Sequence, residues 1–314
     1  MASYLVKRFL RSFLTLAIIL TIVFVLVRLM PIDGYFPGIE KMNEEQIRNG
    51  LHQMGLDQPL LVQLFRFFKN LLLHGDLGTS RIYRNNVPVA EILSTKIPVS
   101  LKLGSMSLLL ALAVGLPLGT LMAKYKGKLF DHFGALIIVL LQAVPSAVYY
   151  LFIQLYGTEW LGISMLFKPD KAISWVLPVI SLSLGNIAYY AMWLRRYMVD
   201  ESMKDYILLA RIKGASEGRI MFRHIFRNAF VPLAQYLPTS FLNTVVGSIY
   251  VESLYSIPGM GGLLVDVVTK QDNAMIQGIV LLFACVGVVG LLLGDLLMAL
   301  LDPRINFAKK GGDR

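Results

Sequence analysis

Few side chains in this 314-residue sequence are placed to do chemistry on their own. The four histidines are scattered, and none has the His-Glu-x-x-His spacing that puts two metal ligands and a general base on one helix. No Gly-x-x-x-x-Gly-Lys-Ser/Thr loop is present to hold nucleotide phosphates, and no Gly-x-Ser-x-Gly turn exposes a nucleophilic serine. The sequence therefore predicts a non-catalytic chain that binds no cofactor and no metal.

The composition is that of a membrane protein. Hydrophobic residues make up 56% of the chain, charged residues 16%, and the mean hydropathy is +0.62, whereas soluble domains carry roughly 25% charged residues. Windows long enough to cross a bilayer as α-helices, with almost no charge, cover approximately residues 10–30, 99–123, 132–156, 175–194, 230–251 and 274–301. We predict an all-α polytopic membrane protein with six transmembrane helices.

Basic residues predict the orientation of these helices. If the amino terminus is cytoplasmic, the cytoplasmic segments hold more than half of the 30 lysines and arginines, and the two short outer loops keep only Lys168, Lys171 and Lys270. Both termini are therefore expected in the cytoplasm. The net charge of +10 is explained by this orientation and by anionic membrane lipids, so we expect no nucleic-acid partner.

Four regions follow from this pattern. Residues 1–30 form a cytoplasmic lead and the first transmembrane helix, and residues 303–314 form a cytoplasmic tail. Residues 31–94 form an extracytoplasmic segment with short helices near 43–48 and 58–73, the second of them amphipathic and packed on the membrane bundle. Residues 95–302 form the membrane core.

Prolines and glycines inside the predicted spans suggest bends and close helix contacts. We expect local breaks in helix hydrogen bonding at Pro117, Pro145, Pro178 and Pro238, serving either packing or hinges of a moving gate. The pairs Gly115/Gly119 and Gly290/Gly294 have the spacing that lets two helix backbones approach. Asp295 is the clearest ionisable residue inside a span, and its role is either structural, which we favour, or mechanistic.

The most informative segment is a polar, basic loop, residues 195–229, between two apolar spans. Ser202-x-x-Asp205 fits a capping box, which predicts a helix starting near Met203, and Gly214 suits a left-handed helix end. Ser216 is placed to cap a second helix with a stripe of Arg219, Arg223 and Arg227 and an apolar stripe of Phe222, Ile225, Phe226 and Ala229. Such helices either dock into a partner's groove or lie on anionic lipid.

The spacing of particular residues resembles a known family. Ala210-x-x-x-Gly214, followed by His224, Asn228-Ala229 and Pro232, resembles the coupling loop of ABC importer permeases, in the version of the peptide/nickel family. Four further motifs resemble the B-type permease subunit of that family: Gly55-Leu-Asp-Gln-Pro59, Gly75-Asp-Leu-Gly-x-Ser80, Glu252-x-x-Tyr-Ser-x-Pro258-Gly-x-Gly261 and Leu301-Asp-Pro-Arg304. The chain departs from the pattern at Leu208, where the family-wide loop has glutamate, and at Tyr255, where phenylalanine is usual.

The resemblance implies the type I importer bundle and half of a heterodimeric pore for peptides. The expected partners are a second, C-type permease, two cytoplasmic ATPase subunits that bind ATP and Mg²⁺, an extracytoplasmic solute-binding protein and membrane lipids. The residues expected to couple to the ATPases are Asp205, Tyr206, Leu209, Ala210, Arg211, Lys213, Gly214, Ala215, His224 and Asn228.

Two questions stay open at the level of sequence. The cargo is an oligopeptide, a dipeptide, a nickel chelate or another solute, and an ion-coupled carrier is the weaker alternative because intramembrane acids are largely absent. Glu252, Pro258, Gly259 and Gly261 form either an outer gate that contacts cargo or the binding protein, or an ordinary outer loop.

Overall fold

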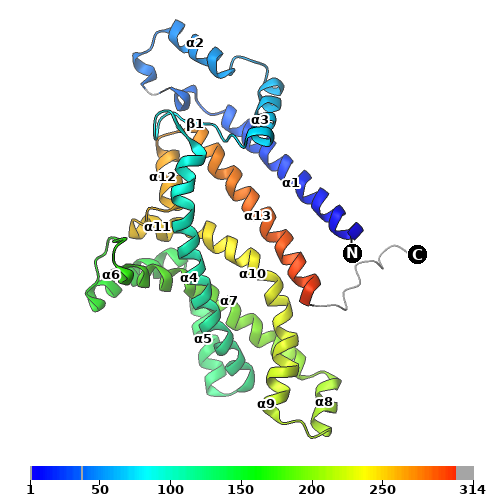
Figure 1. The fold of residues 1–314 in the computed structure, drawn as a ribbon. Helices are drawn as coiled ribbons and strands as arrows, with labels where there is room; N and C mark the ends of the chain where they lie inside the picture. The colour runs from blue at the N-terminus through cyan, green and yellow to red at the C-terminus, as the bar shows by residue number, and fades with distance from the viewer. Residues whose placement is uncertain (1, 37, 302–314) are drawn as a thin grey trace. The chain divides into compact units, whose positions relative to one another are not determined.

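The computed structural model describes residues 2–36 and 38–301, which form two compact units (Figure 1). One unit, the core unit, comprises residues 101–257 and 290–301, and the other, the outer unit, comprises residues 2–100 and 258–289. The predicted tail, 303–314, and residues Asp302 to Arg304 of the Leu-Asp-Pro-Arg motif lie outside the described residues.

Four of the six predicted spans are single helices of membrane length. Long, apolar stretches lie in α1 (Ala2–Arg28), α4 (Val89–Lys124), α7 (Val176–Ser202) and α13 (Asn273–Leu301). The other two predicted spans fall on bent helices that reach membrane length only in combination: α5 (Leu129–Ala143) with α6 (Ser146–Leu161), and α10 (Arg227–Gly247) and α11 (Ile249–Tyr255) with α12 (Met260–Thr269). The predicted all-α membrane class is confirmed, with four to six candidate spans among the described residues.

The predicted third span, 132–156, is not one straight helix. It breaks between Ala143 and Ser146, and α6 leaves α5 at 103°. Pro145 lies at this break, where its missing N–H and its ring prevent the helix from continuing. Pro178, by contrast, lies in the first turn of α7, where no backbone N–H is needed, so its predicted break in hydrogen bonding does not arise.

Small residues in the core unit allow helix backbones to touch, as predicted. A Cβ atom added at Gly119 of α4 would lie 2.6 Å from the carbonyl oxygen of Ala191 on α7. A Cβ atom at Gly294 of α13 would lie 2.7 Å from the carbonyl oxygen of Gln235 on α10. Larger side chains at these positions would force the helices apart.

A buried ion pair joins α5 to α7 in the core unit. The Arg195 guanidinium donates two hydrogen bonds to the Asp131 carboxylate, one of them 2.6 Å long, and the Gly127 amide donates a third at 2.8 Å. Asp131 is buried, so these donors compensate for the loss of its hydration. The two residues lie 64 positions apart, and no local sequence motif predicts their pairing.

The outer unit contains short helices after α1. They are the 3-10 helices η1 (Ile32–Tyr35) and η2 (Ile39–Lys41), followed by α2 (Glu44–Met54) and α3 (Leu60–His74). A capping box between Asn43 and Gln46 starts α2, and Gly55 ends it in the left-handed conformation, with φ of 67°. In the turn that follows, the hydrogen bond with His52 holds the pKa of the Asp57 carboxyl below its usual range.

One buried carboxylate organises the link after α3. A single carboxylate oxygen of Asp272 accepts hydrogen bonds from the Ser80 hydroxyl at 2.7 Å and from the backbone amides of Arg81, Ile82 and Tyr83 at 2.9–3.1 Å. This fixes the two-stranded hairpin of β1 (Thr79–Ser80) and β2 (Val87–Pro88) against the start of α13. Ser80, the last residue of the Gly75–Ser80 motif, therefore has a structural role in this link.

Candidate functional site

The candidate site is the loop between α7 and α10 in the core unit, residues 203–226. Its first helix, α8 (Asp205–Ile212), starts two residues later than predicted. The Ser202 capping box is wrong, because α7 continues through Ser202, whose hydroxyl donates to the Val199 carbonyl at 2.7 Å. Lys204 occupies the N-cap position of α8 instead.

The end of α8 explains the spacing of Ala210 and Gly214. The Ala215 amide donates to the Ala210 carbonyl at 3.1 Å, and the Gly214 amide donates to the Arg211 carbonyl at 2.9 Å. This pair of bonds is a Schellman motif, which requires a left-handed residue between helix and turn. Gly214 has φ of 77°, so its predicted conformation is confirmed.

The second part of the loop is helical but not a regular α-helix. Ser216 occupies the predicted N-cap position of α9 (Glu217–Arg219), but its side chain forms no capping hydrogen bond, and a π-helical stretch, η4 (Ile220–Phe226), leads into α10. The arginines of the predicted stripe are all exposed. Phe222 is 66% exposed rather than part of the apolar face, because i→i+5 bonding widens the turn and shifts residues spaced by four.

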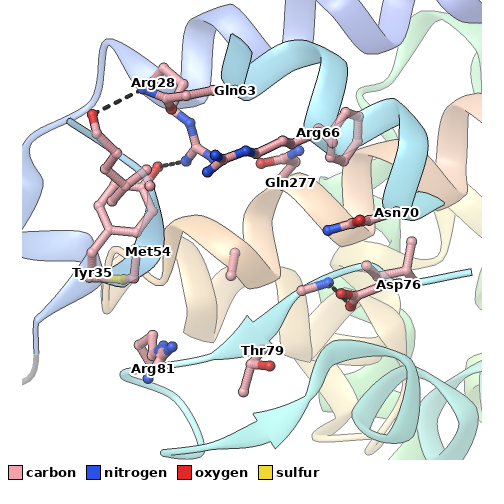
Figure 2. A pocket seen from close by; sticks show the side chains of 16 residues that line it. Arg28, Tyr35, Met54, Gln63, Arg66, Asn70, Asp76, Thr79, Arg81 and Gln277 are labelled. Atoms are coloured by element: carbon pink, nitrogen blue, oxygen red, sulfur yellow. Dashed lines mark hydrogen bonds between the residues drawn. The ribbon is translucent and has the colours of Figure 1, made fainter. Parts of the chain in front are cut away.

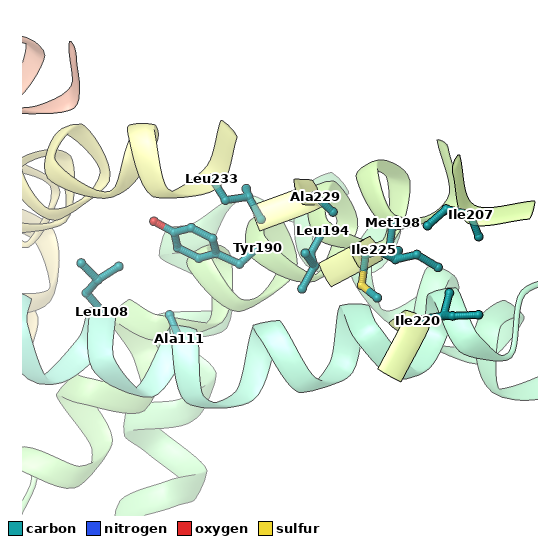
Figure 3. Packing of buried hydrophobic residues seen from close by; sticks show 10 residues of the cluster. All are labelled: Leu108, Ala111, Tyr190, Leu194, Met198, Ile207, Ile220, Ile225, Ala229 and Leu233. Atoms are coloured by element: carbon teal, nitrogen blue, oxygen red, sulfur yellow. The ribbon is translucent and has the colours of Figure 1, made fainter. Parts of the chain in front are cut away.

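Buried side chains anchor this loop to the membrane helices, as Figure 3 shows. Ile207 of α8 and Ile220 of η4 are fully buried, and they belong to one cluster with Tyr190, Leu194 and Met198 of α7. The rest of that cluster comes from α4, η4 and α10: Leu108, Ala111, Ile225, Ala229 and Leu233. Burying one such side chain contributes about 1.5–3 kcal/mol, so the loop is firmly attached to the helices around it.

Polar contacts connect parts of the loop that the sequence separates. The Tyr206 hydroxyl donates to the Glu201 carboxylate, and the Asn228 amide donates to the Tyr206 hydroxyl at 2.8 Å. Arg211 forms an exposed ion pair with Glu217 at 2.9 Å, worth at most about 1 kcal/mol. Glu201 and Glu217 were missed at the sequence level, where their acidic character among many basic residues is the only signal.

The structure brings only some of the predicted coupling residues together. Tyr206 meets Asn228, while Ala210, Arg211, Gly214 and Ala215 meet in the helix end. His224 is half-buried. Asp205, Leu209 and Lys213 stay exposed at the surface.

The outward surface of the loop is apolar in the middle and basic around it. Leu208, Leu209 and Ile212 of α8 are exposed, Ile212 by 75%. Elsewhere in the loop, a cavity of about 600 Å³ is lined by Met221, Phe222 and Ile225, and its charged lining residues are Lys124, Lys126, Arg211 and Glu217. Exposed apolar side chains gathered on a well-anchored element mark an interaction surface.

The residues of the predicted outer gate are divided between the two units. Glu252 of α11 lies fully buried in the core unit, where its carboxylate accepts a hydrogen bond from the Ser248 hydroxyl at 2.6 Å. Pro258, Gly259 and Gly261 lie in the outer unit, where Gly259 is the N-cap residue of α12. Residues 256–259 between α11 and α12 are not helical, and the role of Glu252, Pro258, Gly259 and Gly261 as a gate stays a prediction.

Comparisons with known proteins agree with this architecture. Residues 115–307 match the family described as the binding-protein-dependent transport system inner membrane component. Residues 1–104 match the N-terminal part of such membrane components. The chain belongs to this family. It is a multi-pass permease subunit of a binding-protein-dependent ABC importer, which is a non-catalytic component of the transporter.

Relatives match this permease from end to end. It is 32% identical over 312 residues to the dipeptide transport system permease protein DppB of Lactococcus lactis subsp. cremoris, which covers 98% of this chain and 100% of the relative. It is 31% identical over 322 residues to the oligopeptide transport system permease protein AppB of Bacillus subtilis, with the same coverage. It is 33% identical over 310 residues to the glutathione transport system permease protein GsiC of Salmonella paratyphi A, again with that coverage.

Solved structures agree at the level of fold. An inward-facing methionine ABC transporter chain matches with a TM-score of 0.54 and 14% identity, covering 68% of this permease and 97% of that chain. An amino acid ABC transporter chain matches with a TM-score of 0.51 and 18% identity, covering 69% and 95%. The membrane core therefore has the fold of ABC importer permeases.

Proposed function

We propose that this permease forms half of a translocation pathway for peptides, either dipeptides or oligopeptides. One observation carries the proposal: relatives named for dipeptide and oligopeptide transport align with 98% of this chain and with their own full length. The relative named for glutathione, itself a tripeptide, supports the same chemical class of cargo. A nickel chelate or another solute is the competing cargo.

The remaining half of the pathway comes from a second, C-type permease. Two cytoplasmic ATPase subunits bind ATP and Mg²⁺, and an extracytoplasmic solute-binding protein delivers the cargo. The loop of residues 203–230 is the contact with the ATPases, and both termini lie on that cytoplasmic side. The exposed leucines of α8 support this role, because an amphipathic helix docks by placing its apolar side chains in a partner's groove.

The geometry supports a mechanical form of coupling. Ile207 on α8 is fully buried against the cluster that contains Leu194 and Met198 of α7. A movement of the docked ATPase that displaces α8 therefore acts on α7 and α10 through packed side chains. In this proposal the permease itself does no chemistry, and ATP hydrolysis in the partner subunits supplies the free energy.

An uptake assay on the reconstituted transporter tests the cargo. The permease is assembled in proteoliposomes with its C-type permease, ATPases and binding protein, and uptake of a labelled dipeptide is measured. Unlabelled dipeptides and longer peptides should compete, a nickel–histidine chelate should not, and uptake should require internal ATP and resist a protonophore. Competition by the nickel chelate alone, or uptake driven by a proton gradient without ATP, would overturn the proposal.

A further inference from the structure

The outer unit contains a second cavity that the transport reaction does not explain. It has a volume of about 420 Å³ and is polar for a membrane protein. Its walls come from the end of α1, η1, the turn after α2, α3, the link before and along β1, and the first turns of α13 (Figure 2). All of these segments belong to the outer unit, so the cavity is complete within it.

Three arginines dominate the charge of this cavity, which we call the arginine pocket. Arg28, Arg66 and Arg81 line it, and Asp76 is the only acidic residue among the lining residues, which leaves two positive charges in excess. Asn70 and Gln277 add neutral hydrogen-bonding groups. Figure 2 shows the side chains of Arg28 and Arg66 directed into the pocket from α1 and α3.

The contacts of these arginines leave donors available. Arg28 donates to the Tyr35 hydroxyl and lies over the Phe24 ring at 4.8 Å, and its buried Nε has no hydrogen-bond partner among the described residues. Arg81 donates to the Asn86 side chain at 3.1 Å. Within the described ranges, none of the three guanidiniums in the pocket forms an ion pair with a carboxylate.

Local contacts order the backbone and the neighbouring side chains around these charges, while Arg66 itself is exposed. The Arg66 guanidinium lies over Gly55, where an added Cβ would meet its Nη1 at 2.7 Å, so the left-handed glycine makes room for it. The Asp272 hydrogen bonds fix the backbone of Arg81, and Asp76 accepts from the Gly78 amide at 2.8 Å. Preorganised guanidiniums with free donors are suited to oxyanions, that is, phosphates and carboxylates, which they bind with charge-assisted hydrogen bonds.

The position of the pocket indicates where the oxyanion comes from. The membrane-length stretch of α1 runs from Arg8 to Arg28, so the pocket opens where that stretch ends, at the depth of lipid headgroups. On α3, the helix that carries Arg66, Leu61 is 78% exposed and Phe65 is 70% exposed. Apolar side chains beside a basic pocket fit a lipid, whose acyl chains and phosphate meet at this depth.

We propose that the arginine pocket binds a phosphate group presented by an anionic phospholipid of the surrounding bilayer. The proposal is independent of the cargo. Binding would neutralise one of the two excess positive charges and hold α1, α3 and the β1 link together through one ligand. Lipid composition would then control the stability of the outer unit.

Native mass spectrometry of the full-length permease in detergent tests this proposal. The probe is phosphatidylglycerol, with phosphatidylcholine as the comparison lipid. The double variant Arg66→Gln/Arg81→Gln should weaken phosphatidylglycerol binding by at least about tenfold. Each substitution removes a charge-assisted hydrogen bond to the phosphate, and the loss of two such bonds is enough for a change of this size. The matched control Arg48→Gln/Arg84→Gln removes two exposed charges of the same unit outside the pocket and should change binding less than about twofold.

A second variant tests the pocket while all three arginines remain in place. Gln277 is buried in the pocket wall, and Gln277→Glu supplies an internal carboxylate that competes for the guanidiniums. It should abolish selective phosphatidylglycerol binding while thermal unfolding in phosphatidylcholine shows a folded protein. Equal loss in the pocket and control variants, or wild-type binding by Gln277→Glu, would overturn the proposal.

Soluble anions form the last arm of the experiment. Inorganic phosphate and an acidic dipeptide are added as competitors at concentrations matched to the lipid. Neither should displace phosphatidylglycerol, because neither gains from the apolar surface around the pocket. Displacement by either one at matched concentration would assign the pocket to a soluble anion and would refute a lipid ligand.

Discussion

At the scale of single residues, Gly214 shows how one backbone conformation defines a coupling loop. Its φ of 77° lets the chain reverse after α8. The Gly214 amide then donates to the Arg211 carbonyl, and the Ala215 amide donates to the Ala210 carbonyl. An added Cβ at Gly214 would meet no atom within 4 Å. Any effect of a substitution here therefore comes from backbone strain and not from a steric clash with neighbouring residues.

We predict that Gly214→Val impairs coupling, whereas Gly214→Asn largely preserves it. A β-branched residue in the left-handed region costs about 1–2 kcal/mol, and asparagine tolerates that region far better. The strain should unwind the end of α8 and displace Leu209 and Ile212. Transport-coupled ATP hydrolysis of the purified complex should fall with valine at unchanged membrane abundance. Equal activity of both variants would show that the conformation of Gly214 is not needed.

The residue scale also shows what the sequence can predict. Gly214 and Asn43 act locally, through bonds within a few positions, so their roles follow from sequence spacing. The Ser202 capping box failed because α7 continues through the predicted start signal, and the Ser202 hydroxyl donates to a carbonyl of α7 itself. The Asp131–Arg195 pair joins residues 64 positions apart, and no local pattern reveals such a contact.

At the scale of elements, α8 has two faces with different tasks. Ile207 holds the helix against the membrane core, and Leu208, Leu209 and Ile212 remain exposed. Ala210 lies between them, half-buried against the same core cluster, so a substitution there would disturb folding and docking together. The π-helical turn of η4 could not be predicted, because it depends on packing of Ile220 and Ile225 rather than on residue spacing.

We predict that Leu209→Asp weakens the association with the ATPase subunits without unfolding the permease. Leu209 is exposed, so the variant should fold, but the docked leucine would be replaced by a charge that loses its hydration. ATPase subunits retained on the affinity-tagged permease should decrease at least about tenfold in apparent affinity. The matched variant Leu166→Asp makes the same change at an exposed position of the predicted outer loop and should retain them fully. Loss of the ATPases in both variants would point to a general effect on the fold.

At the scale of the whole molecule, composition and hydropathy predicted the membrane class and the location of the long apolar helices. They did not predict where a helix bends. Apolar windows located α1, α4, α7 and α13, because a bilayer demands about twenty apolar residues in a helix. The 103° break between α5 and α6 did not follow from hydropathy, since both halves are apolar and only Pro145 marks the break. The distribution of lysines and arginines predicts which ends of the helices face the cytoplasm. That prediction does not depend on how the helices bend, and it is tested by a separate experiment.

We predict that both termini lie in the cytoplasm, and cysteine labelling in intact cells tests this. Cys285 is the only cysteine, so Cys285→Ser provides a background in which single cysteines are introduced. Asn49→Cys and Lys171→Cys, both exposed, should react with a membrane-impermeant maleimide from outside. The orientation predicted by the positive-inside rule places both of their segments outside the cytoplasm. Lys126→Cys and Lys213→Cys, equally exposed, should react only after permeabilisation, since basic loops are retained on the cytoplasmic side. External labelling at 126 and 213 with protection at 49 and 171 would reverse the orientation, and it would also place the α8 surface out of reach of any cytoplasmic ATPase.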